Sequence, residues 1–95
     1  MSRIEELLNE LERKAEGGDE YALNFLRLFN WIEDPLLRRN AMRCSIEINL
    51  YLNKFKWISE EKVLELARKY ECEDIVKLEM ISRDIDKFLY FSDEN

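Results

Sequence analysis

The sequence predicts an all-α protein: a compact bundle of about five helices around one long central helix, in a single domain that spans residues 1–95. Along most of the chain, apolar residues recur at spacings of three and four, the pattern of an amphipathic helix. Residues that favour helix starts precede the apolar stripes at Ser2, Asp19, Asp34 and Ser59. Ninety-five residues suffice for one self-folding domain but not for a deep core.

The first helix is expected over residues 3–16. Ser2 and Glu5 have the spacing of a capping box, and a one-sided apolar stripe follows them. Gly17 and Gly18 end the stripe, because glycine readily takes the left-handed conformation that terminates helices. This helix should lie on the surface with one face on the core.

The second helix is expected over residues 20–33, with Asp19 as its N-cap. Pro35 sets its end, because the residue before a proline is disfavoured in a helix. Apolar side chains cover almost every face of this segment. Such a helix is either buried nearly all round or uses its second face to contact another chain.

The central helix is expected over residues 35–56. Asp34 is a good N-cap, Pro35 suits the first helical position, and two apolar stripes follow. Residues 46–52 also alternate between apolar and polar, which is typical of a strand. We favour a helix because the helical stripe continues to Phe55 and no other segment offers a partner strand.

Two further helices are expected over residues 60–71 and 74–91. Ser59 caps the first, and Asp74 interrupts the apolar stripe where a continuous helix would need an apolar residue. The last helix should direct one stripe toward the core: Ile75, Leu78, Ile81, Ile85 and Phe88.

The two central hairpins can be aligned with a forty-residue offset, since helix starts at Asp19 and Asp34 correspond to those at Ser59 and Asp74. The segment from Phe25 to Pro35, followed by Arg39 and Ala41, resembles a HEAT-type helical hairpin, whose repeats have about this length. Only one hairpin carries this resemblance, and the positions of Arg39 and Ala41 depart from the usual spacing. The favoured interpretation is therefore a compact bundle that contains two helical hairpins of similar length.

Charge is segregated along the chain, which has a net charge of −6. Residues 1–23 carry three basic and seven acidic groups, residues 24–58 six and three, and residues 59–95 six and eleven. Arg38, Arg39 and Arg43 lie in the first turns of the central helix, where the helix dipole favours anions. Two interpretations remain. Acidic groups of the chain pair with the arginines, which we favour, and the candidates are Glu33, Asp34, Glu47 or an acidic flanking helix. Alternatively, the arginines bind a nucleic acid or another polyanion.

The sequence argues against most enzyme classes. It has no histidine, so Ser-His and Cys-His pairs and histidine metal sites are excluded. Cys44 and Cys72 cannot supply a structural zinc site. Cys44 lies on an apolar stripe and reads as a core residue, with a disulfide to Cys72 left open. A helix-turn-helix over residues 60–91 is disfavoured because that segment is acidic. We expect no cofactor, no metal and no catalysis.

Eleven aromatic residues are more than a core of this size needs. Trp31, Trp57, Tyr90 and Phe91 fall off the main stripes and are the expected contact surface. No apolar run reaches the ~20 residues of a membrane span, and no signal peptide is recognisable, so a cytoplasmic location is expected. The sequence thus predicts a protein-interaction or regulatory module, self-associating as a homodimer. Polyanion binding through the three arginines is the alternative.

Overall fold

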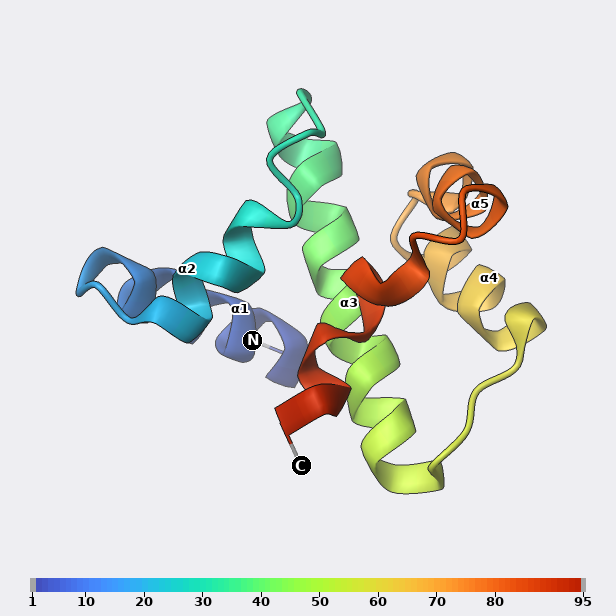
Figure 1. The fold of residues 1–95 in the computed structure, drawn as a ribbon, viewed down its shortest axis with the longest axis horizontal. Coiled ribbons are helices and arrows are strands. Elements are labelled where there is room, and N and C mark those ends of the chain that lie inside the picture. The colour runs from blue at the N-terminus through green and yellow to red at the C-terminus, as the bar shows by residue number, and fades with distance from the viewer. Residues whose placement is uncertain (1, 95) are drawn as a thin grey trace.

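The computed structural model describes the backbone of residues 2–94 and the side chains of residues 2–89. Its elements are α1 (Arg3–Glu16), α2 (Glu20–Arg27), α3 (Pro35–Phe55), α4 (Glu60–Lys69), α5 (Glu73–Ile81) and the 3-10 helix η1 (Ile85–Glu94). Figure 1 shows α3 through the middle of the molecule, with α1 and α2 on one side, α4 and α5 on the other, and η1 beside α3. The all-α prediction is confirmed, with no strand in residues 2–94.

Local capping contacts determine where four of the helices begin. The side chains of Ser2, Asp19, Asp34 and Ser59 each accept a hydrogen bond from a backbone N–H in the first turn that follows. These contacts satisfy N–H groups that have no partner inside the helix. At the end of α1, Gly18 has a φ of +89°, the left-handed conformation expected there.

The segment for which a strand was the alternative, residues 45–53, lies entirely within α3. Its polar positions explain the alternation. Ser45 and Asn49 are buried, and both donate to backbone carbonyl groups of η1: Ser45 Oγ to Lys87 O at 3.3 Å and Asn49 Nδ2 to Phe88 O at 2.8 Å. A buried carbonyl without a partner is costly. These two side chains therefore attach η1 to the central helix.

Three phenylalanine rings form the centre of the core. Phe25 and Phe29 lie with ring centroids 5.2 Å apart, and Phe88 meets the edge of Phe29 at 5.8 Å. All three side chains are buried. Since they come from α2, the turn after it and η1, they connect the second helix to the last element of the described chain.

The second helix is shorter than the predicted range of residues 20–33, because it ends at Arg27 and turns follow. Arg38 from α3 donates from Nε to Ile32 O at 2.7 Å and from its terminal nitrogen to Glu33 O at 3.3 Å. These contacts give the carbonyl groups of a non-helical connection the partners that a continued helix would have supplied. The prediction overlooked this side chain.

The last helix was expected to be continuous over residues 74–91, and this was wrong. The chain breaks after Ile81, where Arg83 takes a φ of +61°, and resumes as η1. The break allows Phe88 to pack on α3 while α5 takes a different orientation about its own axis. As a result, Leu78 and Ile81, expected in the core, are exposed, with relative exposures of 57% and 81%.

Candidate interaction surfaces

Two of the three arginines on α3 are paired with acidic α1. Arg39 reaches Glu12 at 2.6 Å, Glu5 at 3.2 Å and Asn9 at 2.8 Å. Arg43 donates two hydrogen bonds to the same Glu5 carboxylate. These hydrogen bonds, above all that from Arg43, lower the pKa of Glu5, while the bond to Glu12 contributes most to raising the pKa of Arg39. The positive charge therefore has internal partners.

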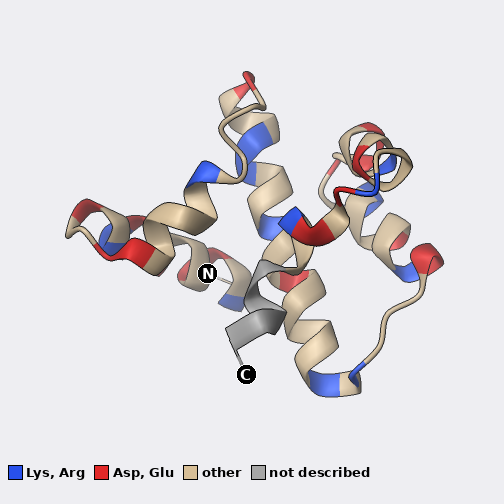
Figure 2. Ribbon diagram, viewed as in Figure 1, with Lys and Arg blue, Asp and Glu red and all other residues tan. Residues whose placement is uncertain are grey.

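Arg38 differs because its partners are the two backbone carbonyl groups of residues 32 and 33. Figure 2 shows the basic residues of α3 in the first half of the helix. The arginine group identified in the sequence therefore serves two structural tasks: it neutralises α1 and supports the α2–α3 connection. Of the internal partners considered, the acidic flanking helix is the one that pairs with Arg39 and Arg43.

Trp31 and Trp57, two of the four predicted contact residues, are exposed at 40% and 70%. They lie in different environments. Trp31 is partly covered by Lys87, whose Nζ is 4.7 Å from the ring centroid. Trp57 follows α3 and lies near the exposed Phe55 in sequence. Their role in an interface stays a prediction. The other two predicted residues, Tyr90 and Phe91, lie outside the described side chains.

The α5 surface was missed from the sequence. Its outward face carries Asp74, Lys77, Leu78 and Ile81, all exposed, at helical spacings of three and four. Its buried positions are Val76 and the acidic Glu79. Helix α5 thus exposes large apolar side chains and buries a carboxylate. The sequence did contain a signal for this surface: the segment from Ile75 to Ile81 has more apolar residues than one face of a helix can hold.

The buried carboxylate of Glu79 is only partly satisfied. Its Oε1 lies 3.3 Å from Lys87 Nζ, whereas Oε2 is buried and has no hydrogen-bond partner among the described residues. Lys87 also pairs with Asp84 at 3.1 Å. Burying a charge without full pairing is unfavourable. The orientation of α5 is therefore unfavourable for the isolated chain in two ways. It exposes Leu78 and Ile81 to water, and it buries a carboxylate that is only partly paired.

Opposite charges lie near the two ends of α5. Glu73 is already occupied by Arg68 at 2.8 Å and Lys77 at 3.3 Å. Asp74 in the first turn and Arg83 just beyond the last turn form no ion pair with the side chains of residues 2–89. Helix α5 therefore has an unpaired acidic side chain in its first turn, and an unpaired basic side chain follows its last turn.

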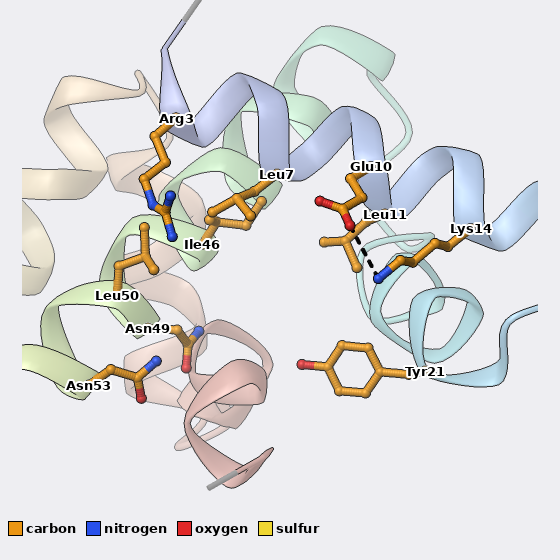
Figure 3. A pocket seen from close by; sticks show the side chains of 10 residues that line it. All are labelled: Arg3, Leu7, Glu10, Leu11, Lys14, Tyr21, Ile46, Asn49, Leu50 and Asn53. Carbon is orange, nitrogen blue, oxygen red and sulfur yellow. Dashed lines mark ion pairs between the residues drawn. The ribbon is translucent and has the colours of Figure 1, made fainter.

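A cavity of about 230 Å³ lies between α1, the start of α2 and α3. Figure 3 shows its lining, including the Glu10–Lys14 ion pair on α1, Tyr21 on α2 and Asn49 on α3, with η1 passing nearby.

The comparisons identify no relative: the chain matches no family model, no curated protein and no solved structure. Within the described residues, no three histidine, cysteine or acidic side chains are grouped so as to hold a metal ion. Nor is any helix in that range long and apolar enough to cross a bilayer.

Proposed function

We propose that this chain is a small interaction or regulatory module that self-associates through the outward face of α5 and has no catalytic role. The observation that carries the proposal is the inversion of α5, in which Leu78 and Ile81 are exposed while Glu79 is buried. Apolar side chains clustered on a soluble protein's surface are typical of contact sites. Covering them would remove the cost of their exposure to water.

A second copy of the chain fits this face by charge. In a twofold dimer the same surface meets itself, so two α5 helices would cross antiparallel. That arrangement brings Asp74 of one copy toward Arg83 of the other, twice per dimer, with Leu78 and Ile81 between them. Antiparallel helix dipoles also place opposite partial charges together. The unpaired charges at the two ends of α5 thus favour self-association over an unrelated partner.

The polyanion alternative is disfavoured by the contacts of the arginines. To bind phosphate, Arg39 and Arg43 would have to leave Glu5 and Glu12, and Arg38 would have to release two carbonyl groups. Fluorescence anisotropy with labelled duplex and single-stranded DNA at low salt tests this alternative. We expect no binding. Salt-sensitive binding that Arg39→Ala and Arg43→Ala abolish would restore the alternative.

Sedimentation velocity at micromolar concentration tests the proposal. We expect a dimer for the native chain and a monomer for a Leu78→Ser, Ile81→Ser variant. Leu36→Ser is the matched control, because Leu36 is 66% exposed in another helix and should leave the dimer intact. Circular dichroism verifies that all variants remain helical. A native monomer, or equal loss of dimer in the control, contradicts the proposal. Loss only in Trp57→Ser would assign the interface to the end of α3.

A further inference from the structure

The cavity of about 230 Å³ in Figure 3, called here the α1–α3 cavity, lies where one face of α1 meets one face of α3. Its α1 members follow the spacing of one helix face: Arg3, Leu7, Glu10, Leu11 and Lys14. Four residues between positions 46 and 53 of α3 follow the same kind of spacing. The walls therefore belong to regular helices, whose packing fixes the positions of the lining side chains.

The lining changes from buried apolar groups to exposed charged groups. Leu11 and Ile46 are buried, with relative exposures of 7% and 1%, and Leu7 and Leu50 are half-buried. Arg3, by contrast, is exposed. The apolar side chains thus form the inner wall, and Arg3 lies at the opening. Sites for small organic molecules have this division, in which an apolar wall binds the body of the ligand and a few polar groups orient it.

The charges at the opening favour an anion. Glu10 and Lys14 pair with each other at 3.3 Å, whereas Arg3 forms no ion pair with the side chains of residues 2–89. Two cations and one carboxylate line the cavity, although the whole chain has a net charge of −6. A guanidinium group binds a carboxylate through two parallel hydrogen bonds. One unpaired arginine therefore matches a ligand with a single carboxylate.

The volume limits the size of such a ligand. An apolar cavity of about 150 Å³ is large enough for benzene, and a drug-sized molecule needs about 300–1,000 Å³. The α1–α3 cavity lies between these values, so it has room for one ring with a short arm. Figure 3 shows Arg3 reaching toward Leu50, at the end of the cavity away from the Glu10–Lys14 pair. This arrangement gives the ligand a charged end and an apolar end.

We propose that the α1–α3 cavity binds a small amphipathic monocarboxylate, such as an arylalkanoate, with its carboxylate at Arg3 and its ring between Leu7, Leu11 and Ile46. Covering the ring removes apolar surface from water. The carboxylate stays near the exposed opening, where loss of hydration costs least. A ligand in this position contacts α1 and α3 together. No residue of α5 lines the cavity, so this binding does not depend on self-association.

The test titrates the full chain with phenylacetate and with its neutral counterpart phenylacetamide, followed by calorimetry and two-dimensional NMR. We expect saturable one-to-one binding of phenylacetate, with the largest NMR shifts in residues 3–14 and 46–53. The amide should bind about fivefold more weakly, the upper range for one exposed ion pair. Arg3→Gln should remove this preference for the acid. Arg13→Gln is the matched control, because Arg13 is exposed on α1 and lies outside the lining.

Filling the cavity tests where the ligand binds. Leu50→Trp places a larger side chain in the lining and should weaken phenylacetate binding by about tenfold or more. Leu36→Trp is its control, because Leu36 is exposed near the start of α3. Circular dichroism verifies folding. If Leu50→Trp does not fold, Leu7→Phe repeats the test from α1.

Any of four results would overturn the proposal. They are no saturable binding at millimolar phenylacetate, equal affinity of the native chain for acid and amide, an unchanged preference for the acid in Arg3→Gln, and undiminished binding in a folded variant with a filled cavity. The calorimetric and NMR readouts are separate from sedimentation, so failure here leaves the α5 interface unaffected.

Discussion

Helices α1 and α5 distribute their apolar and charged side chains in opposite ways. Each packs one face on the rest of the bundle. Helix α1 buries Leu8 and Leu11 and directs its charges outward or toward the arginines of α3. Helix α5 buries Val76 with an acidic group and directs Leu78 and Ile81 into solvent.

The difference shows which unusual feature points to function. The arginines near the start of α3 oppose the helix dipole, but contacts inside the chain compensate for this. The inverted surface of α5 has no such compensation among the described residues. A local rule that is broken without an internal gain is the stronger indication of an external partner.

The same substitution on the two helices should give the largest contrast. Leu8→Ala removes a fully buried side chain and should destabilise the fold by about 2–5 kcal/mol. Leu78→Ala removes an exposed side chain and should cost less than about 0.5 kcal/mol in the monomer. Urea unfolding at low protein concentration measures both. Similar costs would contradict the orientation described for α5.

A smaller effect should come from the charged contact between α1 and α3. Glu5→Gln is expected to cost about 1 kcal/mol at neutral pH, because it weakens hydrogen bonds with two guanidinium groups. Folding lowers the pKa of Glu5 below its usual 4.5, so its contribution is complete above pH 4.5. It is then lost as the pH falls through the lower folded value.

The control for this prediction is the pH dependence itself. The difference in unfolding free energy between native protein and Glu5→Gln should shrink toward zero in acid. A difference that stays constant between neutral pH and strongly acidic conditions would show that the carboxylate charge is not responsible.

A smaller effect than at Glu5 is expected at Glu79. Glu79→Gln removes a buried charge with one unsatisfied oxygen, while Lys87 keeps Asp84 at 3.1 Å. The lost attraction and the relieved desolvation oppose each other, so the net change should be below about 1 kcal/mol. Denaturation of Glu79→Gln and Glu5→Gln under the same conditions compares their changes in the free energy of unfolding. A much larger loss of stability at Glu79 would mean that its ion pair holds α5 in place.

The sequence predicted the parts of the fold that depend on local chemistry. Ser2, Asp19, Asp34 and Ser59 act on N–H groups two or three residues away, so the helix starts were readable. The end of α2 depends on Arg38, six residues beyond the carbonyl group it binds. The break before η1 occurs without a glycine or proline, at Arg83. Tertiary contacts of this kind leave no local pattern.

The candidate surfaces were predictable to a similar extent. Charge segregation indicated that the arginines had acidic partners, but Glu5 lies 38 residues from Arg43, and sequence alone could not select it. Leu78 and Ile81 shared a stripe with Ile85 and Phe88, so a single continuous helix seemed sufficient. Only the rotation of α5 against η1 separates exposed from buried members of that stripe.

Charge reversal tests the antiparallel α5 dimer most directly. Asp74→Lys alone and Arg83→Glu alone should each weaken self-association, because each places like charges opposite each other twice in a homodimer. Mixed in equal amounts, the two variants should form a heterodimer in which both contacts are again attractive. Sedimentation velocity should therefore show monomers for each variant and a dimer for the mixture. Dimers that persist in both single variants, or a mixture that stays monomeric, would contradict this arrangement.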